Sequence, residues 1–197
     1  MPGLDAAFWA YELAIALLIL IIIVSYFSAA PPVFSGRRTA ENMIDLAGIK
    51  AGMRVIDLGS GDGRLLRLAA AKGAYAVGYE INPLLVLYSR LKAFRSPYSR
   101  QISVRWGNLW SADLSGADAV FVYLMPWKME KLKEELLPQL RPGALIVSNT
   151  FVFRDWEPCR VDEKNRVYVF RVGDRSLGPA ASERKFKLEV DKKTGKV

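Results

Sequence analysis

A glycine-rich turn between an apolar strand and a helix is the segment of this chain best suited to chemistry. The run 55–65 reads VIDLGSGDGRL, and its three glycines separate the apolar stretch from a helical pattern. A strand that reverses into a helix beside a ligand needs positive φ angles and no side chain between backbone and ligand. The next predicted strand ends in Glu80, about twenty residues after Asp57, the spacing at which a carboxylate meets ribose hydroxyls. These residues predict a pocket for a nucleoside cofactor.

The order of residues in the turn separates two classes of cofactor. Dinucleotide sites carry GxGxxG, but Arg64 stands here in place of the last glycine, so the match to a nicotinamide site is poor. The turn instead carries a DxGxGxG motif at Asp57, Gly59, Gly61 and Gly63. With the acid at the end of the second strand, this motif resembles that of the class I S-adenosylmethionine-dependent methyltransferases.

That resemblance implies a role for each residue around the turn. Asp57 and the glycine turn would lie against the methionine and ribose, Glu80 would accept hydrogen bonds from the ribose hydroxyls, and Ile81 would pack on the adenine. Asn108 stands where many of these enzymes carry an acid that accepts from the adenine amino group, and its amide oxygen can still accept. The predicted cofactor-binding residues are Asp57, Gly59, Ser60, Gly61, Gly63, Glu80, Ile81 and Asn108.

Several of these features also have a purely structural interpretation. A glycine turn followed by an acid can belong to an α/β scaffold that holds no ligand. Asp62 is explained as a helix N-cap without any cofactor, and Arg64 as a solvated helix charge.

The candidates for the chemical step lie at the end of the fourth predicted strand, 117–124. In a doubly wound sheet the ligand crevice opens at the carboxyl ends of the strands, so residues 123–126 should face the transferred methyl group. Tyr123 and Pro126 loosely match the polar residue, proline and aromatic with which class I methyltransferases hold an amine. Tyr123 either orients a neutral amine or is a core aromatic of a buried strand. Tyr123 and Pro126 are the predicted catalytic residues, with Asn149 and Thr150 as secondary candidates.

Composition excludes many other kinds of enzyme. The 197 residues contain no histidine and one cysteine, Cys159. A histidine general base, a Ser/His/Asp triad, a Cys/His pair and the usual zinc ligand sets are therefore excluded, and no metal site is predicted. Methyl transfer remains possible, because displacement at a sulfonium methyl depends mainly on alignment of the reacting atoms.

The net charge of +8 could attract nucleic acid, anionic lipid or an acidic protein. The first 36 residues contain only Asp5 and Glu12 as charges, so the basic excess begins after them, at Arg37 and Arg38, and recurs in the tail at 184–196. No interleaving of aromatic and basic residues suited to stacking bases is present. The distribution favours a lipid bilayer as partner and argues against nucleic acid.

The N-terminus carries an apolar run at 6–27, about the 20 residues that a bilayer-spanning helix needs. A cleaved signal peptide with a site near 28–30, or a buried core helix, is the alternative. Basic residues after the run and only acids before it predict a single-pass membrane protein whose catalytic domain faces the cytoplasm or an organellar matrix.

The rest of the chain alternates strand and helix patterns, which indicates a parallel sheet covered on both faces. A helix capped by Thr39 precedes the first strand, and a single helix is expected over 127–140. The predicted fold is α/β, a Rossmann-like, doubly wound, mostly parallel sheet with a C-terminal antiparallel hairpin, preceded by one transmembrane helix. The expected divisions are an anchor (1–30), a linker (31–38), an S-adenosylmethionine-binding domain (39–172) and a basic tail (173–197) that is either disordered or an edge strand.

Taken together, the apolar span, the basic linker, the turn at 57–64, the run EINP at 80–83 and the run YLMP at 123–126 resemble a narrower family. This is the family of membrane-anchored protein-lysine methyltransferases that includes the mitochondrial enzyme acting on the c-subunit of ATP synthase. The resemblance implies S-adenosylmethionine as cofactor and a lysine of a membrane-associated protein as methyl acceptor. The alternatives are a methyltransferase for a lipid-phase small molecule, such as a quinone or phospholipid, and a non-catalytic cofactor-binding membrane protein.

Overall fold

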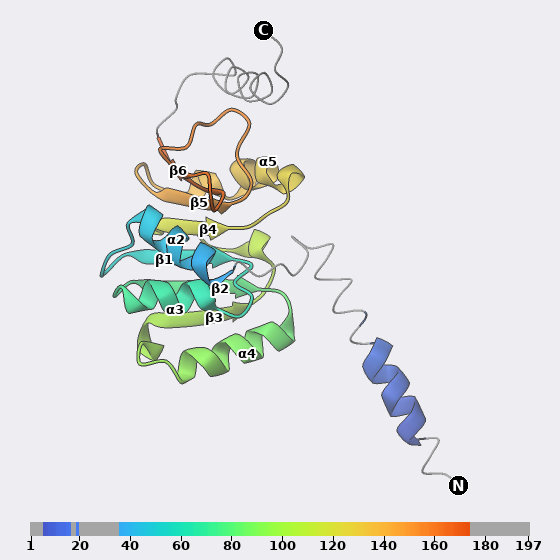
Figure 1. Cartoon of the computed structure of the whole chain (residues 1–197). Helices are drawn as coiled ribbons and strands as arrows, with labels where there is room; N and C mark the ends of the chain where they lie inside the picture. Colours follow the sequence, from blue (N-terminus) through green and yellow to red (C-terminus); the bar gives the residue numbers. More distant parts are fainter. Residues whose placement is uncertain (1–5, 17–18, 20–35, 174–197) are drawn as a thin grey trace.

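The computed structural model describes residues 6–16, 19 and 36–173 (Figure 1). Residues 6–16 and 19 are helical. The helices that follow are α2 (Arg37–Ala47), α3 (Arg64–Ala71), α4 (Pro83–Phe94) and α5 (Pro126–Glu135), with short 3-10 helices η1 (Ser99–Gln101), η2 (Leu109–Ser111) and η3 (Leu137–Gln139). The strands are β1 (Arg54–Leu58), β2 (Tyr75–Glu80), β3 (Ile102–Trp106), β4 (Ala119–Val122), β5 (Leu145–Asn149), β6 (Arg160–Asp162) and β7 (Val167–Arg171).

The seven strands form one sheet in the order β3-β2-β1-β4-β5-β7-β6. Strands β1 to β5 are parallel, while β7 runs antiparallel to both β5 and β6. Helix α4 and strand β3 lie at one end of the domain, and α5 and β6 lie at the other (Figure 1). The sheet confirms the predicted Rossmann-like fold and its C-terminal antiparallel hairpin. Because the strand order reverses beside β1, a crevice is expected at the carboxyl ends of β1 and β4.

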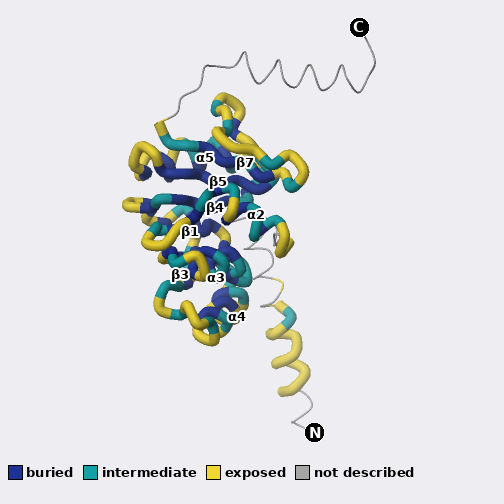
Figure 2. Tube along the Cα trace, turned by 60° about the vertical axis from the view of Figure 1, so that its left-hand side comes forward, coloured by how far each residue is buried: buried dark blue, intermediate teal, exposed yellow. Residues whose placement is uncertain are grey.

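Both faces of the sheet are buried, which explains the apolar character of its central strands. Alternate residues of a strand enter opposite layers: Val55 belongs to the apolar cluster that includes side chains of α2, α3 and α4, whereas Ile56 belongs to the cluster that includes side chains of α5. Figure 2 shows the central strands as the most deeply buried part of the chain. A sheet supported on both sides holds the ends of its strands, and thus the site, in fixed positions.

Two expected helix boundaries are wrong. Helix α2 begins at Arg37 with Gly36 as its N-cap, because the N–H of Ala40 already donates to the carbonyl of Gly36 at 3.0 Å, so Thr39 is not a cap. The expected helix 127–140 ends as α5 at Glu135 and continues as the 3-10 helix η3. Pro138 lies within η3 and has no N–H to donate, which explains the break.

The N-terminal segment is described only in part. Among the described residues, none of the helices combines the length and the apolar character that crossing a bilayer requires. More than half of the predicted anchor and linker, at 1–5, 17–18 and 20–35, and nearly all of the predicted tail, at 174–197, lie outside the described residues.

Candidate active site

The glycine turn has the backbone that the sequence predicted. Gly59, Gly61 and Gly63 have φ angles of +86°, +52° and +71°. The N–H groups of Gly59 and Ser60 donate to the carbonyl of Tyr79 at 2.9 and 3.0 Å, which ties the turn to β2. Residues with a Cβ rarely adopt these angles, so the three glycines are required by the path of the chain.

Glu80 is held directly against the turn. Its carboxylate accepts from the N–H of Gly61 and from the N–H of Asn82, both at 2.8 Å. The residue is only 7% exposed. One buried carboxylate therefore joins the glycine turn after β1 to the start of α4, as expected if the acid and the turn form one site.

Asp57 is the penultimate residue of β1 and is 5% exposed. Burial, followed by the nearby charges of Glu80 and Asp62, raises the pKa of Asp57 to about 8. A cationic ligand at this place would favour the ionised form of the carboxyl. The acids around the turn therefore make an environment suited to a positively charged cofactor.

The glycines of the turn differ in what surrounds them. A Cβ added at Gly59 would meet no atom of the described residues within 4 Å, so Gly59 leaves open space at the turn. A Cβ at Gly63 would overlap the Oγ of Ser89 in α4 and lie 3.3 Å from its Cβ. Gly59 thus leaves room for a ligand, whereas Gly63 allows the start of α3 to approach α4.

The side chain of Ser60 faces the sheet. A Cβ at Gly78 in β2 would lie 2.5 Å from the Oγ of Ser60, and that buried Oγ has no hydrogen-bond partner among the described residues. Ser60 therefore contributes its backbone, and not its hydroxyl, to the lining of the turn.

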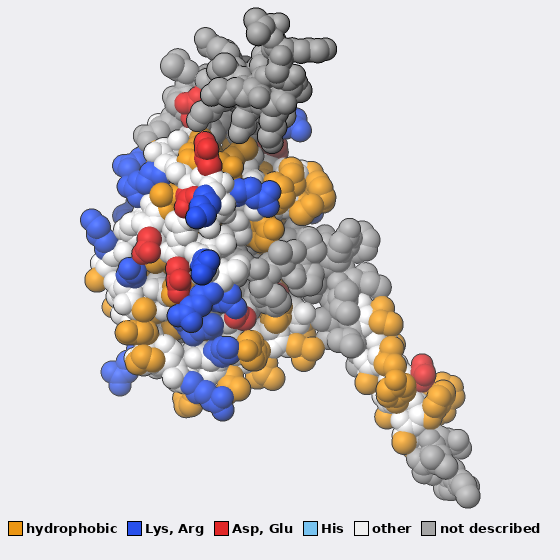
Figure 3. Space-filling model, viewed as in Figure 1, with side chains coloured by type: hydrophobic (Ala, Val, Ile, Leu, Met, Phe, Trp, Pro, Cys, Tyr) orange, Lys and Arg blue, Asp and Glu red, His pale blue; other side chains and the backbone are white. Residues whose placement is uncertain are grey.

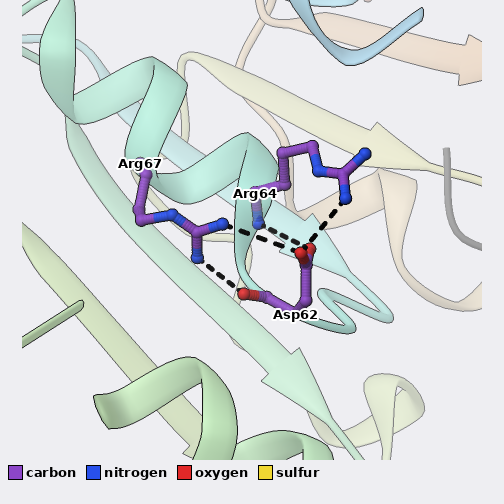
Figure 4. Close-up of polar contacts among 3 residues, drawn as sticks. All are labelled: Asp62, Arg64 and Arg67. Carbon is purple, nitrogen blue, oxygen red and sulfur yellow. Dashed lines mark hydrogen bonds and ion pairs between the residues drawn. The ribbon is translucent and has the colours of Figure 1, made fainter. Parts of the chain in front are cut away.

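Asp62 belongs to a local cluster at the start of α3 (Figure 4). Its side chain accepts from the N–H of Arg64 at 3.1 Å and lies 3.7 Å from Nη2 of Arg67. Arg67 also donates to the carbonyl of Asp62 at 2.6 Å. These contacts support the structural interpretation of Asp62, although the N-cap itself is Gly63.

The residues expected at the adenine lie at the ends of β2 and β3. The carbonyl of Ile81 accepts from Nε1 of Trp106 at 3.0 Å. The amide oxygen of Asn108 accepts from the N–H of Trp110 at 3.2 Å, so Asn108 caps η2. A carbonyl oxygen has a second lone pair, so this cap leaves Asn108 able to accept from a ligand. The sequence reasoning missed Trp106, whose only signal was an aromatic residue at a strand end.

Tyr123 lies just beyond β4, which ends at Val122. Its ring is half-buried and stacks on Phe151 with centroids 6.2 Å apart and planes 19° from parallel. Pro126 is the first residue of α5 and is exposed. The structure thus brings Tyr123 together with an aromatic that the sequence reasoning missed, because nothing in the sequence indicates the stacking.

The secondary candidates lie at the end of β5. Asn149 is buried, and Thr150 has a positive φ of 74°, which is unusual for a β-branched residue. The N–H of Thr150 donates to the carbonyl of Arg166 at 2.6 Å, so the turn of the β6–β7 hairpin holds this strand end.

Comparison with known proteins places the chain in a family. Residues 57–160 match the model of the ANTKMT methyltransferase domain. The chain is similar to the Mus musculus adenine nucleotide translocase lysine N-methyltransferase, with 35% identity over 77% of this chain and 66% of that protein. It is also similar to the Xenopus laevis lysine N-methyltransferase of the ATP synthase c-subunit, with 35% identity over 61% of this chain and 53% of that protein. The chain thus spans about half to two thirds of the length of these relatives.

A solved structure supports the same assignment. The Salinibacter ruber RNA methyltransferase in complex with S-adenosyl-L-homocysteine has a TM-score of 0.69 and 36% identity, over 74% of this chain and 97% of that chain. The open space at Gly59 and the buried acids Asp57 and Glu80 fit S-adenosylmethionine. The matched segment includes the glycine turn, Glu80 and Tyr123. The chain therefore belongs to the family of the ANTKMT methyltransferase domain, whose members are S-adenosylmethionine-dependent methyltransferases.

Proposed function

We propose that this protein transfers a methyl group from S-adenosylmethionine to the amine of a lysine in a membrane-associated protein. The observation that carries the proposal is the convergence of three features at the carboxyl ends of the strands: the glycine turn held by Glu80, the buried Asp57, and the stacked pair Tyr123 and Phe151. The relatives named above are lysine N-methyltransferases of the adenine nucleotide translocase and of the ATP synthase c-subunit, which supports a lysine as the acceptor.

The residues divide the work of such a transfer between binding and orientation. S-adenosylmethionine would supply a methyl group on a cationic sulfur that becomes neutral on transfer. Glu80 would accept hydrogen bonds from ribose hydroxyls, and Asp57 would offset positive charge. The hydroxyl and ring of Tyr123 would position a neutral amine for in-line attack, so that the new C–N bond forms as the C–S bond breaks and the amine then loses a proton to water.

The apolar segment 6–27 would hold the domain at the bilayer. Its length matches a spanning helix, and the basic residues that begin at Arg37 favour a catalytic domain on the cytoplasmic or organellar matrix side. A tethered enzyme meets membrane-embedded acceptors at a high effective concentration, which supports a membrane protein as substrate.

RNA is a second candidate acceptor, because the Salinibacter ruber protein is described as an RNA methyltransferase. A lipid-phase small molecule is a third. If this protein binds the cofactor but methylates nothing, it is a non-catalytic cofactor-binding protein.

One labelling experiment separates these acceptors. Full-length protein is incubated with radiolabelled S-adenosylmethionine, membranes and total RNA, and the label is measured in protease-sensitive, organic-extractable and nuclease-sensitive fractions. We expect label in protein, on lysine after hydrolysis. Label confined to lipid or RNA would refute the lysine proposal, and binding without any transfer would refute catalysis.

The matched variants are Glu80→Gln and Glu163→Gln. Glu80→Gln keeps the size of the side chain but replaces one acceptor oxygen by a donor, next to the N–H of Gly61 or Asn82. We expect cofactor affinity, measured by calorimetry, to fall about tenfold or more. Glu163 is exposed in the β6–β7 turn and its variant should bind normally. Equal affinities for the two variants would remove Glu80 from the site.

A further inference from the structure

Helix α4 has an exposed apolar face that no described element covers. Its buried residues are small or medium in size: Val86, Ser89 and Ala93. Its large apolar side chains instead face outward, with Leu87 68% and Phe94 81% exposed. The exposed set, here called the α4 stripe, consists of Leu84, Leu87, Tyr88, Leu91 and Phe94. Spacings of three, four and seven residues place these side chains on one side of the helix.

The charged residues of α4 and of the segment that follows it are all basic. Residues 81–112 contain five arginines and lysines and no aspartate or glutamate. Of these, the four arginines are exposed, at positions 90, 95, 100 and 105, and the Nζ of Lys92 lies 4.8 Å from the ring centroid of Tyr88. Figure 3 shows hydrophobic and basic side chains side by side over the lower part of the molecule, where α4 lies in Figure 1.

We propose that the α4 stripe and its basic flanks rest on the surface of an anionic bilayer, with α4 lying in the interface. Leucine and phenylalanine on one face of a helix, flanked by lysine and arginine, are the composition of an interfacial helix. This contact is separate from the N-terminal apolar segment and from the proposed methyl transfer, and would fix the orientation of the domain on the membrane.

The other occupants fit less well. Nucleic acid bound by stacking would need aromatic side chains, whereas three members of the stripe are leucines. A second copy of this chain would bring the same basic flanks together, which repel each other. An anionic lipid surface satisfies the apolar and the basic residues at once.

The test reports on α4 itself, because the N-terminal segment could bind vesicles alone. In full-length protein carrying Cys159→Ser, which removes the only native cysteine, an environment-sensitive fluorophore is attached at Leu87→Cys. The matched control carries the fluorophore at Glu134→Cys, an exposed position in α5, which lies at the other end of the domain. Vesicles consist of phosphatidylcholine alone or mixed with phosphatidylglycerol, with and without lipid-borne quencher.

We expect a blue shift and quenching at position 87 with phosphatidylglycerol vesicles, and neither change at position 134. Lys92→Glu with Arg95→Glu should weaken this docking at least about 25-fold, from about fivefold for each basic charge removed. Lys50→Glu with Lys164→Glu makes the same change in net charge at exposed positions outside α4 and should leave docking unchanged. Circular dichroism of each variant checks that the domain is folded.

Four results would overturn the proposal. Equal signals at positions 87 and 134 would mean that α4 has no special contact. A shift produced by RNA, or by raising the protein concentration without vesicles, would assign the stripe to nucleic acid or to a second copy. A fluorophore at position 87 already shielded before vesicles are added would assign it to a segment of the chain itself.

Discussion

At the scale of single residues, Asp57 makes the stability of the folded state depend on pH. Its carboxyl is buried beside Glu80 and Asp62, and its pKa is raised from 3.8 to about 8. The folded state therefore prefers the protonated form more than the unfolded chain does. The stabilising effect of this proton is complete below about pH 4 and is lost as the pH rises to about 8.

Asp57→Asn should remove this pH dependence. The variant keeps a neutral side chain at every pH, so its thermal midpoint should rise relative to the parent protein between about pH 4 and about pH 8. Circular dichroism melting across this range measures the difference. The control is Asp113→Asn. Hydrogen bonds with Ser115 lower the pKa of Asp113, so this residue changes the stability with pH only in the acid range. A constant difference between parent and Asp57→Asn would contradict the argument.

A variant of Tyr123 distinguishes orientation of the amine from binding of the cofactor. In Tyr123→Phe the ring that stacks on Phe151 is kept and only the hydroxyl is lost. If the hydroxyl positions the amine, kcat should fall about 10- to 100-fold while cofactor affinity stays unchanged. Tyr75→Phe, at the exposed start of β2, is the control in the same steady-state assay. An unchanged kcat would show that the ring alone serves the site.

At the scale of elements, the start of α3 depends on a close approach to α4. Gly63→Ala would add a Cβ that overlaps Ser89 and would have to keep a φ of +71°, so the free energy of unfolding should fall by about 2 kcal/mol or more. Denaturant unfolding measures this loss. The control is Gly143→Ala, at a φ of +88° and with no atom of residues 6–16, 19 or 36–173 within 4 Å of the added Cβ. This variant should lose only about 1 kcal/mol.

The double variant Gly63→Ala with Ser89→Ala identifies the cause. Within the part of the chain that the structure describes, the Oγ of Ser89 has no hydrogen-bond partner, so its removal alone should be nearly neutral. The nearest remaining atom to the added Cβ would then be the Cβ of residue 89 at 3.3 Å. Denaturant unfolding should therefore show that the double variant recovers part of the loss. If the losses of the two single variants simply add, the destabilisation by Gly63→Ala comes from the φ angle and not from the contact with Ser89.

Local patterns explain which elements could be predicted from the sequence. The alternation of strand and helix patterns predicted the parallel strands of the sheet, and the C-terminal hairpin was predicted as well. The turn and Glu80 were predicted as one site because their spacing is a property of a βαβ unit. The contacts of Trp106 with Ile81, of Tyr123 with Phe151 and of Gly63 with Ser89 join distant segments, so no local pattern encodes them.

At the scale of the whole molecule, binding of the cofactor should be separable from delivery of the catalytic domain to its acceptor in the membrane. The Salinibacter ruber structure consists almost entirely of this domain, because 97% of its length matches this chain. This coverage indicates that the domain folds by itself. Deleting residues 1–35 should leave cofactor affinity within about twofold, yet lower methylation of a membrane-embedded acceptor about tenfold or more, because the tether is lost. Calorimetry and label incorporation measure the two effects. Full activity of the deleted form on intact membranes would contradict a role of the N-terminal segment in delivery.

The two hydrogen bonds of Glu80 have a consequence for sugar selectivity. Each carboxylate oxygen already accepts one backbone N–H, from Gly61 or Asn82, and each has a lone pair to spare. A vicinal diol offers two donors, whereas its deoxy counterpart offers one. Discrimination between ribose and deoxyribose would thus arise from the acceptor capacity that the polypeptide leaves unused.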